Sequence, residues 1–169
     1  MIYFRTSFLV FVFLSFACKA QNDTTSCFLI KESISVTNYI DADSLLCHAH
    51  TCIGKRYRYS GRSPKTGFDC SGFVHYNFKR FGILLPYSSY EQVKLGEKVE
   101  PHEAKPGDLI FFKGRNTSSK MAGHVGIVVS VSEKAIKFIH AAVTGGVRYD
   151  NTTAEYYKKR FIGVRRLKS

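Results

Sequence analysis

The sequence predicts an α+β fold in which helices pack on one side of an antiparallel sheet. Two segments with helical periodicity, residues 41–53 and 70–81, come first along the chain. Three apolar segments typical of strands, 124–131, 135–142 and 161–167, come after them. Helices and strands that are segregated along a chain, rather than alternating, are typical of this fold class.

Length and composition are those of one folded domain with a short leader. The chain has 169 residues, of which 44% are hydrophobic and 14% aromatic. Its formal net charge is +12, from 25 Lys and Arg against 13 Asp and Glu. Such a charge attracts polyanions, among them nucleic acid, anionic lipid and acidic cell-wall polymers. Charge alone does not choose among these.

The N-terminal residues have the pattern of an export signal. Arg5 precedes the apolar run Phe8–Phe16. The run is shorter than the ~20 residues that span a bilayer as a helix, but it fits a secretory signal. We therefore expect an exported protein of the periplasm or cell envelope, with no nucleic acid as partner.

Two interpretations of the end of this signal stay open. Leu14–Cys18 resembles a bacterial lipobox, although Ser15 stands where an aliphatic residue is usual. In that case a lipid on Cys18 attaches the protein to a membrane, as in an outer-membrane lipoprotein. Alternatively the signal is cleaved after Ala20. Either way we divide the chain into a signal (1–20), a tether (21–40) and a folded domain (41–169).

The first helix is expected from Asp41 or Asp43, either of which can cap its start, to Ile53, where Gly54 stops it. Its apolar stripe consists of Leu45, Leu46, Ala49, Cys52 and Ile53.

Asp69 is a good N-cap for the second helix, Cys70–Phe81, and Gly82 follows at the position that favours glycine. Its core face consists of Phe73, Val74, Phe78 and Phe81.

Turn signals organise the middle of the chain. Ser88–Gln92 predicts a short capped helical turn. Pro106–Asp108 predicts a turn that leads into a strand at Leu109–Phe112, and Lys113–Gly123 is a polar loop.

Three of the five cysteines, Cys27, Cys47 and Cys52, belong neither to the leader nor to the Cys70 motif. Cys47 and Cys52 are five residues apart on a helix, so they lie on nearly opposite sides and should not form a disulfide with each other. A bridge from Cys27 to one of them stays open. Otherwise we expect small buried thiols.

Cys70 is the candidate nucleophile. A thiol is nucleophilic as the thiolate, and a helix N-terminus and a nearby imidazole are two devices that lower its pKa. The small neighbours Ser71 and Gly72 let another backbone or a substrate approach. The free N–H of Cys70 itself could bind a developing oxyanion. The alternative is a buried core cysteine. The pattern indicates cysteine-based acyl transfer, most simply the hydrolysis of an amide.

Most of the six histidines are poor partners for Cys70. His75 points to another side of the same helix. His48 and His50, with Cys47 and Cys52, scatter around a helix axis, so we expect no metal site. His102 lies in a charged loop.

His124 and His140 remain. His124 begins a strand, and Gly126 on the same face leaves space beside the imidazole. His140 ends the alternation of Ile136, Phe138 and His140 on an apolar face, where a buried imidazole needs a hydrogen-bond partner. A neighbouring imidazole would supply it, and His140 would then orient that imidazole, as the third member of a triad does. A structural histidine is the alternative.

These motifs together resemble the NlpC/P60 family of cell-wall peptidases. The resemblance covers about residues 43–167 and rests on motifs in the expected order. They are Tyr57-x-Tyr59-x-Gly61, Gly67–Val74, Leu85-Pro86-x-Ser88-Ser89-x-x-Gln92, Pro106–Phe112, His124–Val128 and Ile139–Ala141.

The resemblance implies a papain-like α+β fold and the hydrolysis of peptide bonds in peptidoglycan stem peptides, commonly between D-γ-glutamate and a diamino acid. By matched position, Cys70 resembles the nucleophile, His124 the general base and acid, and His140 the residue that orients His124. Tyr57 matches a tyrosine near the nucleophile, and Asp69 and Ser71 match its substrate-side neighbours. No metal or cofactor is implied, and we expect a monomer.

Two departures from the family pattern fall beside the site. Ser60 stands where many members have glycine, and Tyr87 replaces a frequent basic residue, so both are expected to reshape the substrate groove. Three other functions stay open: a papain-like amidase or acyltransferase acting on cell-wall material, a non-catalytic wall-binding protein, and an exported toxin directed at the walls of rival cells. An intact Cys/His/His set argues against pure binding.

Overall fold

The computed structural model describes residues 41–167. The predicted signal, with Cys18, and the predicted tether lie outside the described residues. In chain order the elements are α1 (Ala42–His50), β1 (Arg62–Ser63), β2 (Gly67–Phe68), α2 (Cys70–Lys79), α3 (Ser89–Gln92), β3 (Glu97–Val99), the 3-10 helix η2 (Pro101–Glu103), β4 (Leu109–Lys113), β5 (Ala122–Val131), β6 (Ile136–Ala142), β7 (Gly146–Asn151), α4 (Glu155–Lys158) and β8 (Phe161–Arg166). The described part contains no helix long and apolar enough to cross a membrane.

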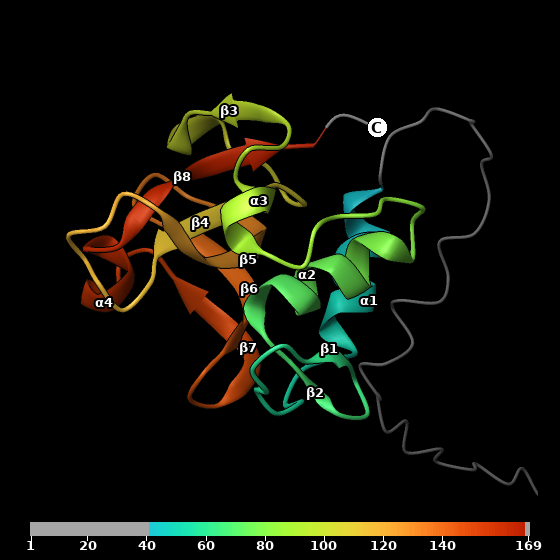
Figure 1. Ribbon diagram of the computed structural model, residues 1–169. Coiled ribbons are helices and arrows are strands. Elements are labelled where there is room, and N and C mark those ends of the chain that lie inside the picture. The colour runs from blue at the N-terminus through green and yellow to red at the C-terminus, as the bar shows by residue number, and fades with distance from the viewer. Residues whose placement is uncertain (1–40, 168–169) are drawn as a thin grey trace, which may run out of the picture. The chain divides into compact units, whose positions relative to one another are not determined.

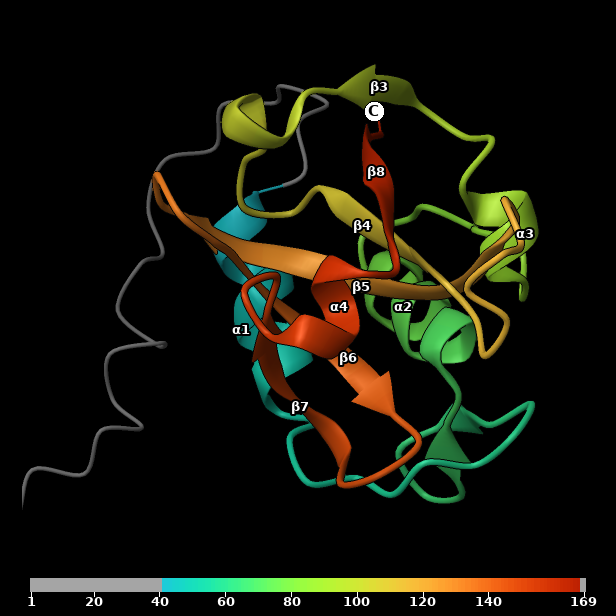
Figure 2. The same cartoon turned by 90° about the vertical axis from the view of Figure 1, so that its left-hand side faces the viewer.

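A six-stranded antiparallel sheet with the order β3-β8-β4-β5-β6-β7 is the centre of the fold. The helices α1 and α2 lie on one side of it, and the short helix α4 lies on the other (Figures 1 and 2). The predicted α+β class is thus confirmed. The two predicted main helices lie on the same side of the sheet, as expected, whereas α4, for which the sequence made no prediction, lies on the other.

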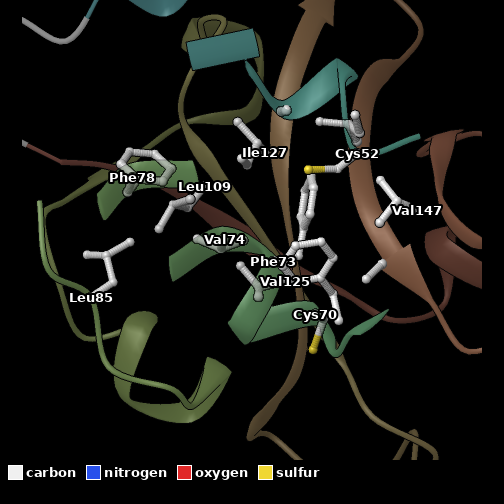
Figure 3. Packing of buried hydrophobic residues seen from close by; sticks show 14 of the residues in the cluster. Cys52, Cys70, Phe73, Val74, Phe78, Leu85, Leu109, Val125, Ile127 and Val147 are labelled. Atoms are coloured by element: carbon white, nitrogen blue, oxygen red, sulfur yellow. The ribbon is translucent and has the colours of Figure 1, made fainter. Parts of the chain in front are cut away.

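Each face of the sheet has its own hydrophobic core. The first core joins α1 and α2 to the sheet through Leu45, Phe73 and Phe78, which are fully buried. Figure 3 shows Phe73 and Phe78 within this core. The second core lies on the α4 side and contains Phe112, Phe138 and Tyr157. The two cores press from opposite sides on β4, β5 and β6, so these strands form the most enclosed part of the sheet.

The first helix begins as predicted and ends earlier. Asp41 caps it by accepting hydrogen bonds from the backbone N–H groups of Asp43 and Ser44. The helix ends at His50, and a turn that includes Cys52 follows. Within the predicted stripe Leu45, Ala49 and Cys52 are buried, whereas Ile53, in the turn after the helix, is 38% exposed.

The second helix starts at the predicted residue. The Asp69 carboxylate accepts from the N–H of Gly72 at 2.6 Å, and the helix runs from Cys70 to Lys79. Gly82 follows with a φ of +82°, a conformation that glycine adopts at no steric cost.

The four predicted strands are confirmed to within about two residues, as β4, β5, β6 and β8. The predicted turn at Ser88–Gln92 is α3, although Ser88 makes no side-chain cap bond. The sequence prediction missed β7 and the short strands β1, β2 and β3. β7 follows the turn residues Gly145 and Gly146, which have φ values of +89° and +68°, and pairs with β6 through its whole length.

Asp108, in the predicted turn before β4, is buried and ion-paired. Its carboxylate accepts from Arg166 Nε and Nη2, each at 2.8 Å, and from the N–H of Lys105 at 2.7 Å. The pair ties the start of β4 to the end of β8. This is a structural ion pair, because it lies at the opposite end of β4 from the Phe112/His124 pairing.

Candidate active site

The start of α2 is held against the loop before β1. The N–H of Asp69 donates to the carbonyl of Gly61 at 3.0 Å. A Cβ on Gly72 would lie 2.1 Å from that same carbonyl oxygen. Gly72 therefore allows the close approach of another backbone, as the sequence analysis expects, and this contact fixes where Cys70 lies.

We expect Gly72→Ala to destabilise the fold and to reduce activity. The carbonyl of Gly61 cannot move away without displacing the loop, so the substitution should cost about 2–3 kcal/mol of unfolding free energy. Thermal unfolding measures the loss. Gly114→Ala is the control, because its Cβ would meet only the Cα of Gly123, at an ordinary 3.5 Å. Equal melting temperatures for both variants would contradict the prediction.

Cys70 lies at the edge of the first core, with its side chain 9% exposed. Its sulfur points away from the other labelled members of the cluster (Figure 3). The backbone N–H groups of Val125 in β5, of Ser71 and of Cys70 itself each lower the pKa of this thiol, against the larger effect of burial, so they lie on the side of the sulfur. The sulfur is therefore neither in open solvent nor enclosed in hydrocarbon.

The sheet leaves room for this contact. The pairing of β5 with β6 runs from Val131 and Ile136 to Ile127 and Ile139 and ends there. Val125 lies two residues beyond Ile127, past the end of this pairing, so β6 does not take up its N–H, and this backbone group favours the Cys70 thiolate. Since Val125 follows His124 directly, the structure brings the start of α2 to the part of β5 that carries the predicted base.

His124 and His140 are hydrogen-bonded to each other. The Nε2 of His124 lies 2.6 Å from the Nδ1 of His140, and the rings meet edge to face at 4.8 Å. His124 is half-buried, whereas His140 is fully buried against Phe138 and Tyr157. The predicted contact of the two imidazoles is confirmed, and the Nδ1 of His124 has no hydrogen-bond partner among the described residues.

Gly126 leaves space beside His140 rather than beside His124. A Cβ at Gly126 would lie 3.2 Å from the Cβ of His140 and 2.9 Å from the ring of Phe138. The strand β6 can therefore lie close to β5 at this point.

Three further polar residues surround His140, and the sequence analysis missed all of them. The Oδ2 of Asp150 lies 2.8 Å from the Nε2 of His140. The same oxygen accepts from Arg148 Nε at 2.8 Å and from the Tyr157 hydroxyl at 2.9 Å. The sequence does contain a signal for the strand that carries two of them. Gly145-Gly146 followed by the alternating residues Val147–Asp150 is typical of the turn and second strand of a hairpin.

Burial controls the proton affinities of the two central groups. It raises the pKa of Cys70 to about 11, and the charge of Asp69 raises it further. Burial also lowers the pKa of His124 to about 3, helped by His140 and opposed by Asp150. The expectation that the helix N-terminus lowers the thiol pKa was wrong for the net shift, because burial outweighs the backbone amides. The resting pair is a neutral thiol and a neutral imidazole.

Tyr57, Asp69 and Ser71 lie around Cys70. Tyr57 is bridged to Phe68, two residues before Cys70. Burial raises the pKa of Tyr57, and the charges of Cys70 and Asp69 raise it further. The Asp69 carboxylate caps α2 and also accepts from the hydroxyl of Ser71 at 3.1 Å. The buried Ser71 is thus engaged in the start of the helix, and its carbonyl accepts from Gln92 at 3.2 Å.

The remaining histidines have other partners. His48 bonds to Asn77 at 2.9 Å, and His50 bonds to the hydroxyl of Tyr149 at 2.8 Å. His75 bonds to the carbonyl of Leu85, and His102 is exposed in η2. His75 therefore lies where the sequence analysis expects it, away from the thiol.

Cys47 in α1 and Cys52 in the turn after it differ. Cys52 is a free, buried thiol, as predicted for these residues. Cys47 is disulfide-bonded, so the expectation of a small buried thiol was wrong for it.

The two departures from the family pattern have structural explanations. Ser60 has a φ of +54°, the one non-glycine residue with positive φ among those described. A glycine would adopt this conformation without strain. Tyr87 stacks on His75 at 3.9 Å, and the Arg62 guanidinium lies 3.8 Å above its ring. Tyr87 thus joins the loop before α3 to β1 and α2.

A thiol at a helix start, packed against a strand whose histidine is hydrogen-bonded to a second, buried histidine, is the layout of a thiol hydrolase with an α+β fold. The chain belongs to the NlpC/P60 family, whose model matches residues 54–166. It is 39% identical over 117 residues to the Escherichia coli protein "Murein DD-endopeptidase MepS/Murein LD-carboxypeptidase", with 69% of this chain and 57% of that protein covered. It is 31% identical over 146 residues to the "Gamma-DL-glutamyl hydrolase" of Bacillus subtilis, with 83% and 34% covered.

Solved structures agree with this assignment. A Staphylococcus aureus protein of the NLP/P60 family, described as similar to lipoprotein, has a TM-score of 0.67 and 29% identity, over 82% of this chain and 45% of its own. A Bacillus cereus member has a TM-score of 0.66 and 30% identity, over 74% and 39%. The chain spans less than two thirds of the length of the two curated relatives named above.

Proposed function

We propose that this protein is a peptidoglycan endopeptidase that hydrolyses peptide bonds of murein stem peptides with Cys70 as nucleophile. The observation that carries the proposal is the hydrogen-bonded pair of His124 and His140, with His124 next to Val125, the residue of β5 whose backbone favours the thiolate of Cys70. Relatives named as murein endopeptidases and a γ-DL-glutamyl hydrolase support the substrate class.

The reaction follows from the positions of these groups. The thiol of Cys70 gives its proton to His124 as the sulfur attacks the scissile carbonyl carbon, and backbone N–H groups, that of Cys70 among them, bind the oxyanion. His124 then protonates the departing amine, which leaves a thioester. It next takes a proton from water, whose oxygen attacks the thioester. The C–S bond breaks, the sulfur regains its proton from His124, and the new carboxylic acid leaves and gives its own proton to the solvent.

Because the resting thiol is neutral, proton transfer and attack belong to the same step. Tyr57, Asp69 and Ser71 are proposed to line the substrate side of this groove. Asp69 caps the start of α2, directly before Cys70, and Tyr57 is bridged to Phe68, the residue before Asp69. His140 is proposed to orient His124 as the third member of the triad.

The bond between D-γ-glutamate and the diamino acid is the proposed point of cleavage. The test is incubation of the purified full-length protein with defined muropeptides, followed by mass spectrometry. A new carboxyl group on D-glutamate with a free diamino acid amine supports the proposal. Cleavage of a D-alanyl crosslink instead would identify the activity named for the Escherichia coli relative. Transfer of the acyl group to an added amine in preference to water would identify an acyltransferase and refute hydrolysis.

The location is proposed to be the periplasm or cell envelope, with a lipid on Cys18 as the membrane anchor and the monomer as the active form. In the cell envelope, a cationic protein is attracted to the anionic polymers of the wall. Mass spectrometry of the mature N-terminus tests the anchor: a diacylglyceryl group on Cys18 supports it, and an N-terminus at Gln21 refutes it.

We expect salt to weaken hydrolysis of intact sacculi. With a net charge of +12, the protein is held near polyanionic wall by a field that ions screen over about 8–10 Å. Raising NaCl from 50 to 300 mM should raise the apparent KM on sacculi several-fold. The kcat on a short uncharged peptide substrate should not change. Equal salt effects on the two substrates would contradict this prediction.

A further inference from the structure

We propose that Asp150 is a positioning residue that acts through His140 on His124, so that the relay that begins with Cys70 has four members rather than three. This inference rests on the proposed function, in which His124 is the base.

The strand β7 brings Asp150 to this position. His140 in β6 is paired with Arg148, and Phe138 is paired with Asp150. Asp150 is thus the diagonal neighbour of His140 on the same face of the sheet, the face on which α4 lies. Figure 2 shows α4 in front of β6, and its Tyr157 donates to Asp150 from there.

The Asp150 carboxylate determines which ring nitrogen of His140 carries a proton, and His140 then determines the same for His124. An ionised carboxylate only accepts, so the Nε2 of His140 must carry the hydrogen of their 2.8 Å bond. Burial lowers the pKa of His140 despite the opposing effect of Asp150, so the ring is neutral and its Nδ1 is an acceptor. The Nε2 of His124 must then donate to it. This leaves the lone pair of His124 on Nδ1, the nitrogen without another partner.

The same carboxylate favours the charged state of His124 that forms when Cys70 gives up its proton. Its negative charge raises the pKa of His124, against the larger effect of burial. Asp150 is itself held ionised: burial opposes this, but bonds from His140, Tyr157 and Arg148 outweigh it and lower the pKa of Asp150 to about 2.

Arg148 does not cancel this effect. Its guanidinium is 44% exposed, so solvent screens it, whereas the Asp150 oxygen is in direct contact with the fully buried His140. The titratable and charged groups that face Asp150 are His140 from β6, Arg148 from β7 and Tyr157 from α4, and His124 of β5 lies beyond His140. Burial, and then Asp150 itself, raise the pKa of Tyr157, so Tyr157 stays neutral over the usable pH range.

Alkylation of Cys70 by iodoacetamide tests the proposal without any peptidoglycan substrate. In Asp150→Asn, which keeps the size of the side chain and removes its charge, the rate at pH 7 should fall by at least tenfold. The deficit should narrow as the pH rises toward 10, because the thiolate then forms without transfer of a proton to His124. A deficit that is the same at every pH, or no deficit, would overturn the proposal.

Chemical rescue supplies a second measurement. Asp150 lines a cavity of about 360 Å³ together with His140, Arg148 and Tyr157. In Asp150→Ala this space opens beside the Nε2 of His140, so added formate should restore part of the alkylation rate at pH 7. Chloride at the same concentration should not. Rescue by both anions alike would contradict a role for the carboxylate.

Asp108→Asn is the matched structural control, because Asp108 is a buried carboxylate paired with Arg166 at the same 2.8 Å distance. It should lower the melting temperature and leave the pH dependence of alkylation unchanged. If the muropeptide assay fails but the Asp150 variants show the pH-dependent deficit, the substrate is wrong and the relay holds. If the Asp108 variant shows the same pH-dependent deficit, the relay is refuted.

Discussion

Cys70→Ala should abolish hydrolysis of muropeptides while leaving the protein folded. The sulfur is the atom that attacks the scissile carbonyl, so its removal should reduce kcat/KM by about 10⁴-fold or more. The thiol is neutral in the resting protein, so no ion pair is lost with it. The cost in stability should therefore be near 1 kcal/mol, the value of one small apolar group at the edge of a core. Mass spectrometry of the products and thermal unfolding measure the two effects.

Cys52→Ala is the matched control. Cys52 is also a free, buried cysteine of the first core, and burial raises its pKa too. The variant should lose some stability and keep full activity. Wall binding by Cys70→Ala, measured by sedimentation with sacculi, should persist. Turnover by Cys70→Ala, or loss of turnover in Cys52→Ala, would refute the assignment of the nucleophile.

Local patterns allowed the sequence to predict the two main helices and four strands of the sheet. Asp69 before Cys70 is a cap that acts within four residues, and the alternation of Ile136, Phe138 and His140 is a property of one strand. Such signals depend on neighbours along the chain. For this reason the contact of His124 with His140, on adjacent strands joined by a short turn, was also predictable.

Asp150 could not be found in this way, because its role depends on the register of β6 and β7. A shift by one residue would put Asp150 on the opposite face of the sheet, away from His140. The sequence analysis did not include β7, so it had no means to place Arg148 or Asp150 beside His140. Tyr157 reaches the same carboxylate from a helix of four residues, which is too short for a periodic pattern.

The direction of the Cys70 pKa shift was missed for a related reason. The helix N-terminus, which lowers a thiol pKa, is visible in the sequence. The degree of burial is not, since it depends on how closely β5 packs against the start of α2. Amides of Val125 and Ser71 do favour the thiolate, but loss of water from around the sulfur has the larger effect.

His140→Ala should lower kcat/KM by more than tenfold, which corresponds to at least about 1.4 kcal/mol in the barrier. Without His140 the Nε2 of His124 loses its bond, so neither the orientation of the ring nor the nitrogen that carries its proton is fixed any longer. The loss should fall on kcat rather than KM, because His140 is fully buried and cannot touch the substrate.

The unfolding free energy of His140→Ala must be measured together with its kcat, because the substitution also affects stability. The substitution leaves a cavity next to Phe138 and removes one of the partners of Asp150, so a cost of about 2–3 kcal/mol is expected. His140→Asn separates the two effects. Its amide can accept from His124 and donate to Asp150, so it should recover a part of kcat that the alanine variant lacks. If both variants keep wild-type kcat while melting lower, His140 is a structural residue only, because an orienting role requires the rate to change with the hydrogen bond.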